Sequence, residues 1–384
     1  MKILVVAPQP FYEERGTPIA VRLLVETLCD FGHDVDLLVY QQGQPIEFPR
    51  LRIVRAGRPP GIKHVPIGFS WQKLVSDVWL AATMIRLLVT RRYDVVHAVE
   101  EAVFLAVVFN LFSRRRLVYD MDSWLSQQLT DKAKPLRPLR PLLVGIERLA
   151  ARRSTVVLPV CEDLAQVARG WVNPDKVVLL PDVPVGDAGT NGVQESLRAI
   201  AGPEALIALY VGNLERYQGI DLMLDGLARL PRDLPMQTIV IGGSAVDIEH
   251  YRGRATDLGL ADRVHFIGPR PVAHLNAYLA QADLLLSPRT LGQNTPMKVY
   301  SYMQSGKAIL ATAIRSHTQV LDDDCAELVA AEPESWAAGL ARLASDIERR
   351  QRLGAAAQAR VERDYSLAAY RARLRQAYDR VAAG

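Results

Sequence analysis

A short segment in the second half of the chain combines two cations with the signals that start a helix. In PRTLGQNTPMKVYSYMQSGK, Thr295 is an expected N-cap and Pro296 an expected first helical residue. Lys298 follows in the first turn, where a cation opposes the positive end of the helix dipole. An anion bound nearby would explain that placement, and Arg289, at the end of the preceding expected strand, could bind the same anion. The alternative is that both cations point to solvent.

The first half of the chain contains a similar arrangement without the cations. After the apolar run MKILVVA comes PQPFYEERGTPIAV, in which Gly16 precedes Thr17, an expected N-cap, and Pro18, an expected first helical residue. A glycine at this point lets the backbone turn tightly and lets a ligand approach. Free N–H groups at a helix N-terminus suit a phosphate. The alternative interpretation is a helix that is merely well capped.

Glycines also follow two expected strands of the second half. Gly212 and Gly219 bracket a loop in YVGNLERYQG, and Gly242 and Gly243 end VIGGS. Ligands of doubly wound sheets bind beyond the carboxyl ends of the strands, so each loop is a candidate contact for a phosphate or a sugar. Neither loop matches G-x-G-x-x-G, so the sequence gives only weak support to NAD binding.

One histidine and several carboxylates follow expected strands of the first half. His97 ends YDVVH, and it could bond a substrate hydroxyl if the strand register turns its ring toward the ligand. Asp122, in YDMDSW, is a plausible contact to a sugar or an acceptor. Glu100 and Glu101 fall at an expected helix start, where we favour the interpretation that they complement the helix dipole.

The other polar residues form no pattern typical of a metal site or an activated nucleophile. HAVEEA lacks the second histidine of a zinc protease motif, and no Ser-His-Asp or Cys-His arrangement is evident. The three cysteines are scattered and odd in number, which argues against a disulfide framework and for a reducing compartment. We therefore predict neither a metal nor a cofactor. The histidines without metal spacing are His265, His274 and His317.

An alternation of strands and helices must position the candidates of the first half. Short β-rich runs separated by helical patterns indicate parallel strands joined by crossover helices. The expected strands span residues 2–7, 34–40, 95–98, 117–121, 156–159 and 177–180. The expected helices span residues 18–31, 74–90, 102–112 and 141–153.

The second half repeats this alternation after a linker at residues 181–194, which is rich in Pro, Gly, Asp and Asn. The sequence therefore predicts an α/β protein of two Rossmann-like, doubly wound parallel-sheet domains. The expected strands span residues 206–211, 237–241, 263–266, 283–287 and 308–311. The expected helices span residues 220–229, 245–258, 274–281 and 296–304, followed by a long helical tail.

Composition agrees with two ordinary globular domains. The chain has 384 residues, of which 49% are hydrophobic and 23% charged. No stretch of 18 residues is free of charge, so we expect no membrane-spanning helix, and MKILVVAPQPF indicates a buried strand rather than a signal peptide. The net charge is +4, and the first half carries the excess of Lys and Arg. This excess suggests an anionic partner, either a phosphorylated acceptor or a membrane surface.

Two segments of the first half could rest on an anionic membrane surface. They are the basic segment DKAKPLRPLRPLLVGIERLAARR and the helix that contains Trp71 and Trp79. An ordinary solvated helix face is the alternative for both. The sequence thus favours a cytoplasmic protein with peripheral contact to the inner face of the membrane, and it gives no indication of nucleic-acid binding.

Over essentially its whole length the sequence resembles the GT-B retaining glycosyltransferases of family 4 type, the glycosyl transferases group 1. DFGHDVDLLVY resembles the second strand of that family, and YDVVHA resembles its third-strand motif, whose His lies near the donor sugar. LADRVHFIGPRPVAHLNAYLAQADLLLSPRT is very similar to the run that leads to the donor loop. YSLAAYRARLRQAYDRV resembles the final helix, which crosses back onto the first domain. The resemblance implies domains at residues 1–183 and 184–364, facing across a cleft, and a returning helix at 365–384.

The sequence departs from this family at informative positions. The usual pair of glutamates, eight positions apart, falls on Gln293 and Ser301, an amide and a hydroxyl. The usual Arg and Lys after the first strand of the second half fall on Asn213 and Gln218. Both diphosphate cations are therefore missing from their usual places. The strand-end arginine and the first-turn lysine described first are the candidates to replace them.

The resemblance implies transfer of a sugar from a UDP- or GDP-linked donor to a hydroxyl of a saccharide or lipid-linked acceptor, with retention and without metal. The expected catalytic residues are His97, Arg289 and Lys298. The expected donor contacts are Gly16, Thr17, Gly212, Asn213, Gln218, Gly243, Arg270, Gln293, Asn294, Thr295, Pro296 and Ser301. The expected acceptor-side residues are Tyr12, Glu13, Arg15 and Asp122.

Two other classes of function remain open from the sequence. A nucleotide-sugar 2-epimerase has the same fold, consumes donor and water without an acceptor, and usually carries more carboxylates at its site. A catalytically degenerate binding protein would explain the lost pair of glutamates. The retained cations and both Thr-Pro pairs argue against the degenerate protein.

Overall fold

The computed structural model describes residues 1–14, 16–62, 65, 70–110, 115–132, 134–186 and 195–383. Contacts between residues divide the chain into two compact units. Unit 1 comprises Met1–Pro181 and Tyr370–Gly384, and unit 2 comprises Asp182–Ala369. The divisions thus fall at 181/182 and 369/370, where the sequence analysis placed them at 183/184 and 364/365.

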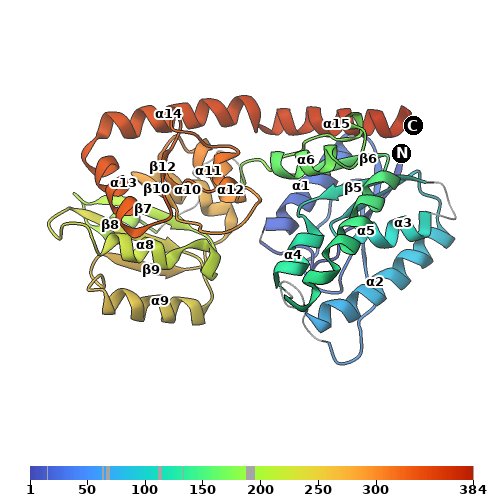
Figure 1. Ribbon diagram of the computed structural model, residues 1–384, viewed down its shortest axis with the longest axis horizontal. Coiled ribbons are helices and arrows are strands. Elements are labelled where there is room, and N and C mark those ends of the chain that lie inside the picture. Colours follow the sequence, from blue (N-terminus) through green and yellow to red (C-terminus); the bar gives the residue numbers. More distant parts are fainter. Residues whose placement is uncertain are drawn as a thin grey trace. The chain divides into compact units, whose positions relative to one another are not determined.

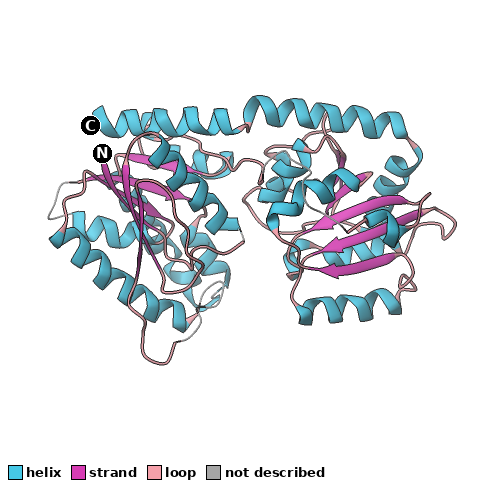
Figure 2. Ribbon diagram, turned by 180° about the vertical axis from the view of Figure 1, so that it is seen from behind, coloured by secondary structure: helices cyan, strands magenta, loops and turns pink. Residues whose placement is uncertain are grey.

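Unit 1 is built on a six-stranded sheet whose strand order is β3-β2-β1-β4-β5-β6. Every pairing in it is parallel, so each connection is a crossover, as predicted. The central strands are almost wholly apolar because helices cover both faces of the sheet (Figures 1 and 2). The strands are β1 (Lys2–Val6), β2 (Asp34–Val39), β3 (Leu51–Arg55), β4 (Val95–Val99), β5 (Arg116–Met121) and β6 (Val156–Pro159).

The helices of unit 1 pack on opposite faces of this sheet. Val96 and Ala98 share one apolar core with residues of α2, α3 and α5, whereas the intervening His97 contacts Tyr378 of α15 on the other face. The helices of this unit are α1 (Gly16–Asp30), α2 (Trp71–Thr90), α3 (Ala102–Asn110), α4 (Leu125–Lys132), α5 (Arg140–Arg153), α6 (Glu162–Arg169) and α15 (Leu367–Ala383).

Unit 2 repeats the same topology, with the strand order β12-β11-β10-β7-β8-β9 and parallel pairings. Its strands are β7 (Leu206–Val211), β8 (Met236–Ile241), β9 (Val264–Gly268), β10 (Leu284–Ser287), β11 (Ala308–Thr312) and β12 (Glu327–Val329). Its helices are α7 (Leu197–Ala201), α8 (Ile220–Leu227), α9 (Ala245–Asp257), α10 (Leu275–Gln281), α11 (Met297–Gln304), α12 (Arg315–Thr318), α13 (Pro333–Ser345) and α14 (Ile347–Asp364).

The sequence patterns missed some elements and added one. The edge strands β3 and β12 were not expected, nor were the short helices α4 and α6. Residues 177–180, expected as a strand, contribute only an isolated bridge between Val157 and Val177. The predicted fold class is confirmed, because each unit has the strand order of a doubly wound Rossmann-like sheet.

Candidate functional site

The strand order places a binding site at one position in each sheet. The chain reverses its direction of winding between β1 and β4 in unit 1, and between β7 and β10 in unit 2. Ligands of doubly wound sheets bind at the carboxyl ends of the strands at such a switch point. In unit 2 the loops after Val211 and Ser287 emerge there.

Lys298 of α11 lies at this edge of unit 2. Its Nζ lies 3.9 Å from the centroid of the buried Tyr210 ring, and it donates a hydrogen bond of 3.4 Å to Oε1 of Gln218. Burial, followed by the positive charge of Arg289, holds the pKa of Lys298 well below its usual value. No carboxylate of the described residues offsets the charge of this lysine. An anion is the ligand that would stabilise the charge at such a site.

Arg289, which follows β10, is folded back into its own loop. Its Nε donates to the carbonyl oxygen of Leu291 at 2.7 Å, and its Nη1 donates to that of Asn294 at 3.1 Å. The guanidinium also lies 5.2 Å from the centroid of the Tyr217 ring. Burial lowers its pKa. Arg289 therefore fixes the loop that leads to Lys298, and it adds positive charge behind that lysine.

A buried network that the sequence analysis missed holds the end of β10. Ser287 bonds Nε2 of His317 at 2.8 Å, and Nδ1 of His317 lies 2.9 Å from the carbonyl oxygen of Thr312. The Thr312 hydroxyl donates to the carbonyl oxygen of Arg289. Burial lowers the pKa of His317 to about 4, so the ring is neutral, with Nδ1–H as donor and Nε2 as acceptor of the Ser287 proton.

Close backbone packing joins the loop after β7 to the loop after β10. The amide of Thr290 donates to the carbonyl oxygen of Tyr217 at 3.0 Å. Gly219 has φ +75°, and a Cβ on it would lie 1.9 Å from the carbonyl oxygen of Pro288, so no other residue fits there. The loop that carries Gln218 is therefore fixed against the loop that carries Arg289.

The ends of β7 and β8 are equally close. Gly242 has φ +115°, and a Cβ on it would lie 2.1 Å from the carbonyl oxygen of Gly212. The neighbouring Gly243 packs against Leu214, and the carbonyl oxygen of Asn213 accepts a hydrogen bond from the Tyr210 hydroxyl at 2.6 Å. The strand ends thus present bare backbone, to which a ligand can approach closely.

The segment before α11 differs in detail from the expectation. The helix begins at Met297 with Pro296 as its N-cap, so the prediction that Thr295 caps the helix is wrong. The Thr295 side chain is buried, and its hydroxyl has no hydrogen-bond partner among the described residues. The carbonyl oxygen of Gln293 accepts from Gln319 at 2.7 Å. Thr295 therefore offers an unmatched hydroxyl two residues from the α11 N-terminus.

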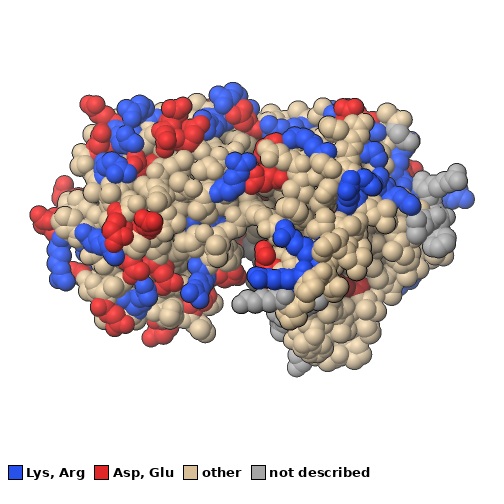
Figure 3. All heavy atoms as spheres, viewed as in Figure 1, with Lys and Arg blue, Asp and Glu red and all other residues tan. Residues whose placement is uncertain are grey.

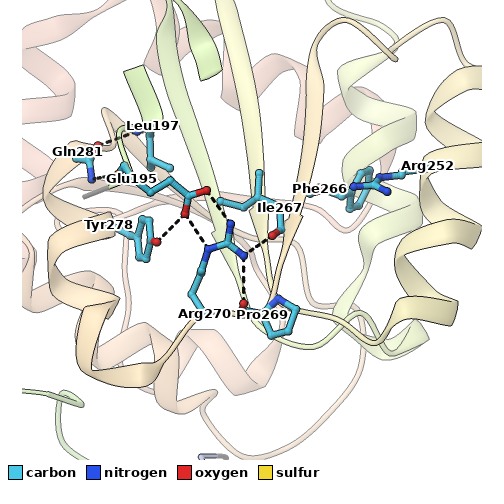
Figure 4. A network of polar contacts seen from close by, with 9 residues as sticks. All are labelled: Glu195, Leu197, Arg252, Phe266, Ile267, Pro269, Arg270, Tyr278 and Gln281. Carbon is cyan, nitrogen blue, oxygen red and sulfur yellow. Dashed lines mark hydrogen bonds and ion pairs between the residues drawn. The ribbon is translucent and has the colours of Figure 1, made fainter. Parts of the chain in front are cut away.

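Arg270 and Ser301 are both held by protein partners. In Figure 4 the Arg270 guanidinium makes two bonds of 2.7 Å to Glu195, whose carboxylate also accepts from Tyr278 at 2.7 Å. Nη1 of Arg270 donates to the carbonyl oxygens of Ile267 and Pro269. Ser301 is fully buried and accepts from the amide of Val185 at 2.9 Å. Their expected role in donor binding stays a prediction that these contacts do not support.

At the first loop of unit 1, helix α1 begins at Gly16, so Thr17 and Pro18 lie inside the helix. The expectation that Thr17 is the N-cap is therefore wrong. Tyr12 is held by paired backbone hydrogen bonds of 3.2 and 3.0 Å with Gln44, while Glu13 follows it half-buried. Arg15, the other acceptor-side candidate of this loop, lies outside the described residues.

His97 is placed differently from the expectation. It pairs in register with Val5 and Val118, and this register turns its ring toward α15. The ring is fully buried, with Nδ1 2.9 Å from the Tyr378 hydroxyl and Nε2 3.2 Å from Asp120. Both ring nitrogens therefore have protein partners, and His97 anchors the C-terminal helix on unit 1. Its expected catalytic role has no support in this geometry.

The carboxyl edge of unit 1 is rich in carboxylates. Tyr40 follows β2 and donates to Asp77 of α2, while Glu101 follows β4 and pairs with Lys73. Burial, and to a lesser extent the charge of Glu101, raise the pKa of Asp77 to about 6. Glu100 adopts φ +51°, a strained conformation for a non-glycine residue. The interpretation of Glu100 and Glu101 as dipole partners is thus incomplete, because Glu101 belongs to this polar cluster.

A further buried carboxylate holds the segment that follows Asp122 in the chain. Glu147 of α5 accepts from the amides of Leu125 and Ser126 at 3.1 and 3.0 Å, and from the Tyr119 hydroxyl at 3.2 Å. These bonds hold the start of α4 next to the half-buried Asp122, which follows β5. Burial nevertheless raises the pKa of Glu147.

Both units match known sequence families. Residues 194–360 match the profile "Glycosyl transferases group 1", and residues 15–182 match "Glycosyl transferase 4-like domain". The chain belongs to this glycosyltransferase family. The D-inositol 3-phosphate glycosyltransferase of Corynebacterium diphtheriae is 27% identical over 225 residues, which are 55% of this chain and 52% of that protein. The chain thus spans about half the length of the curated relatives that it matches.

Solved structures show that the fold of this glycosyltransferase family member is GT-B. Sucrose-phosphate synthase of Thermosynechococcus elongatus superposes with a TM-score of 0.79 at 20% identity, over 100% of this chain and 99% of that one. Anabaena HepE in complex with UDP-glucose superposes with a TM-score of 0.75 at 16% identity, over 99% of each chain. At such identities the likeness concerns the fold alone.

The described residues of this family member show neither a metal-binding cluster nor a membrane-spanning helix. They contain no group of three or more His, Cys, Asp or Glu side chains that could hold a metal ion. None of their helices is long and apolar enough to cross a membrane.

Proposed function

We propose that the chain transfers a sugar from a UDP- or GDP-linked donor to a hydroxyl of a saccharide or lipid-linked acceptor, with retention of configuration. The observation that carries this proposal is the charge of Lys298, which no carboxylate of the described residues offsets, at the switch point of unit 2. A half-buried cation at a sheet edge of bare backbone suits a diphosphate. The family membership of the chain supports the same assignment.

In the proposed reaction the bond between the anomeric carbon and the diphosphate oxygen breaks, and negative charge develops on the leaving diphosphate. Lys298 stabilises that charge where it appears, so its contribution is larger in the transition state than in the bound donor. The acceptor oxygen forms the new bond to the anomeric carbon, and its proton passes to the diphosphate.

The network around β10 supports this step by holding its parts rigid. Arg289 fixes the loop carbonyls at residues 291 and 294, and His317 and Thr312 fix the backbone of Arg289. Preorganised groups need no rearrangement at the moment of reaction, which is the main source of electrostatic catalysis. Arg289 acts in this proposal as a positioning residue.

We assign the acceptor to unit 1 because the side chains at the edge of its sheet suit sugar hydroxyls. Asp77, Glu101 and Asp122 are carboxylates at the edge of its sheet, and carboxylates accept hydrogen bonds from sugar hydroxyls. Tyr12 adds an aromatic ring at the same edge, and Cζ of Arg22 lies over that ring, 5.2 Å from its centroid. A neutral polyol fits this surface better than a polyanion does. A polyol phosphate also fits if its phosphate group points away from these carboxylates.

The two alternatives make different predictions. A 2-epimerase needs acid and base groups beside the sugar, and the side chains that Lys298 contacts, Tyr210 and Gln218, are not carboxylates. A degenerate binding protein would retain donor binding without turnover. Release of diphosphate that depends on an acceptor would separate the transferase from both.

The test is an assay of UDP or GDP release from UDP-glucose and GDP-mannose. The curated relatives are named for D-inositol 3-phosphate, so this compound is the first acceptor to try beside simple saccharides. Acceptor-dependent release that yields a glycoside of retained configuration is the expected result. Release of free sugar epimerised at C2 would favour the epimerase, and binding without any release would favour the degenerate protein.

A further inference from the structure

Large exposed apolar side chains gather on one face of unit 1. Helices α2, α3 and α5 cover one side of the sheet and share one core with it. Their inner sides carry buried residues such as Leu80, Val103 and Ala150. Their outer sides, which we call the α2–α3–α5 face, bear large exposed apolar side chains. The exposed apolar residues of this face are Trp71, Leu74, Val78, Ile85, Val89, Val108, Leu142, Ile146 and Leu149.

On α2 these residues recur with helical spacing along a single stripe. Trp71, Leu74 and Val78 occupy one line of the helix, and Ile85 and Val89 continue it two turns later. Trp71 is 65% exposed and Val89 is 80% exposed. In Figure 3 the surface over α2 is mostly free of charged side chains. Such a stripe along a whole helix is an interaction surface rather than scattered surface apolarity.

Helix α3 has no polar side at all before its last residue. Its sequence AVFLAVVFN contains no charge, yet only three of its side chains are buried, and Val108 is 54% exposed. A helix that is apolar all round normally lies inside a core or in contact with lipid. Phe104, Leu105 and Val107 are half-buried against the same core, and Val108 is the exposed apolar side chain that α3 adds to the face.

Helix α5 adds the charge. Leu142, Ile146 and Leu149 form an exposed stripe, and its only carboxylate, Glu147, is buried against α4. Its exposed charges are all positive, as is the one exposed charge of α2. The exposed charged residues on the three helices are Arg86, Arg140, Arg148, Arg152 and Arg153.

We propose that the α2–α3–α5 face docks on the surface of a lipid bilayer that contains anionic lipids. The apolar side chains enter the boundary between headgroups and acyl chains, and the arginines contact lipid phosphates. Arginines near an anionic surface are attracted to it, and salt screens this attraction. A second copy of the chain fits less well, because a two-fold interface would place these arginines against one another.

This inference does not depend on the proposed reaction, since it concerns no residue assigned to donor or acceptor. It does limit the orientation of unit 1, because the same helices that meet the lipid are fixed to the sheet that carries the carboxylates.

The test uses sedimentation of the full chain with vesicles of phosphatidylcholine alone, or of phosphatidylcholine with phosphatidylglycerol. We expect the wild type to bind the anionic vesicles at least about tenfold more tightly, with weaker binding as salt is added. The double variant Val89→Asp/Leu142→Asp should lose at least about tenfold in that affinity. Val246→Asp is the matched control, because Val246 of α9 is also 80% exposed but lies in unit 2.

A second readout follows Trp71 directly. Its fluorescence should shift to shorter wavelength when anionic vesicles are added, and Trp71→Phe should remove that shift. The inference is overturned if the wild type binds neither kind of vesicle, or if the double variant binds anionic vesicles with the same affinity as the wild type. It is also overturned if the variant instead abolishes a dimer in analytical ultracentrifugation. A melting-temperature shift with UDP or GDP that is retained in the double variant keeps a failure here separate from failure of the proposed function.

Discussion

The switch points of the two sheets have the same topology and opposite electrostatics. In unit 2 the edge carries Lys298 with Arg289 behind it, and no described carboxylate offsets the lysine. In unit 1 the corresponding edge carries Asp77 and Glu101, with Lys73 as the partner of the latter. The comparison teaches that the strand order fixes where a ligand binds, while a few side chains fix which ligand that is.

The same contrast appears in the direction of the pKa shifts. Burial raises the pKa of Asp77 and Glu147 in unit 1, and it lowers that of Lys298 and His317 in unit 2. In all four cases burial favours the neutral form. The groups of unit 1 therefore reduce stability as pH rises, and those of unit 2 reduce it as pH falls.

Removing the cation of unit 2 should have the largest effect. We expect Lys298→Met to lower kcat/KM for the donor by about 10²–10³-fold, since a group that stabilises developing charge is lost. The same variant should melt at a higher temperature than the wild type without ligand, because a partly desolvated charge without a carboxylate partner is removed. Steady-state kinetics and thermal melting check the two parts.

Lys307→Met is the matched control for that change. Lys307 precedes β11 and so lies at the amino end of the strands, opposite the switch point. It should alter kcat/KM by less than about twofold. An equal loss of kcat/KM in both variants would show that Lys298 has no specific role at the site.

The next effect tests the buried histidine of unit 2. The pKa of His317 is about 4 in the fold against 6.5 unfolded, so the stability it provides is complete above pH 6.5 and is lost as pH falls to 4. That loss is about 3 kcal/mol. Between pH 7 and pH 4, the free energy of unfolding should fall by about 3 kcal/mol less in His317→Gln than in the wild type, as measured by urea titration. Parallel pH profiles would contradict the assignment.

A smaller effect is expected when the edge of unit 2 is made to resemble that of unit 1. Gln218→Glu places a carboxylate where Oε1 now lies 3.4 Å from Lys298 Nζ. The lysine then has an internal partner, so affinity for UDP or GDP should fall by about tenfold, a change of about 1.4 kcal/mol. Calorimetric titration measures this, and unchanged affinity would mean that Lys298 does not meet the diphosphate.

The smallest effect concerns the opposite edge. Asp77 has a folded pKa of about 6 against 3.8 unfolded, so it costs stability increasingly as pH rises through this window. Asp77→Asn should therefore stabilise unit 1 at pH 8 by about 1 kcal/mol after allowance for solvent, and not at pH 4. Thermal melting at the two pH values decides this, and a gain of the same size at pH 4 would exclude the buried charge as its cause.

Much of the fold could be read from the sequence, because the buried central strands are continuous apolar runs. Strand β3 escaped because LRIVR carries two arginines on a half-buried edge strand. Strand β12 has only three residues, so no periodicity could develop. Helix starts at Gly16 and Met297 were misplaced by one to two residues, since capping preferences fix helix ends only approximately.

The site was partly predictable for a different reason. Lys298 stood out as a candidate because a cation in a first helical turn breaks a local rule, and such breaks are expected at functional sites. The orientation of His97 could not be predicted, because the face to which it points depends on the strand register, which pairs it with Val5 and Val118. The roles of His317 and Thr312 arise from long-range contacts across β10 and β11, for which the sequence contains no local signal.

The most direct test is a calorimetric titration of UDP and GDP into the wild type and into Lys298→Met. We expect one diphosphate to bind the wild type, because Lys298 at the switch point of unit 2 has no carboxylate partner among the described residues. In Lys298→Met the affinity should fall by at least about tenfold. Equal affinity in both proteins, or no binding of either diphosphate to the wild type, would contradict the account.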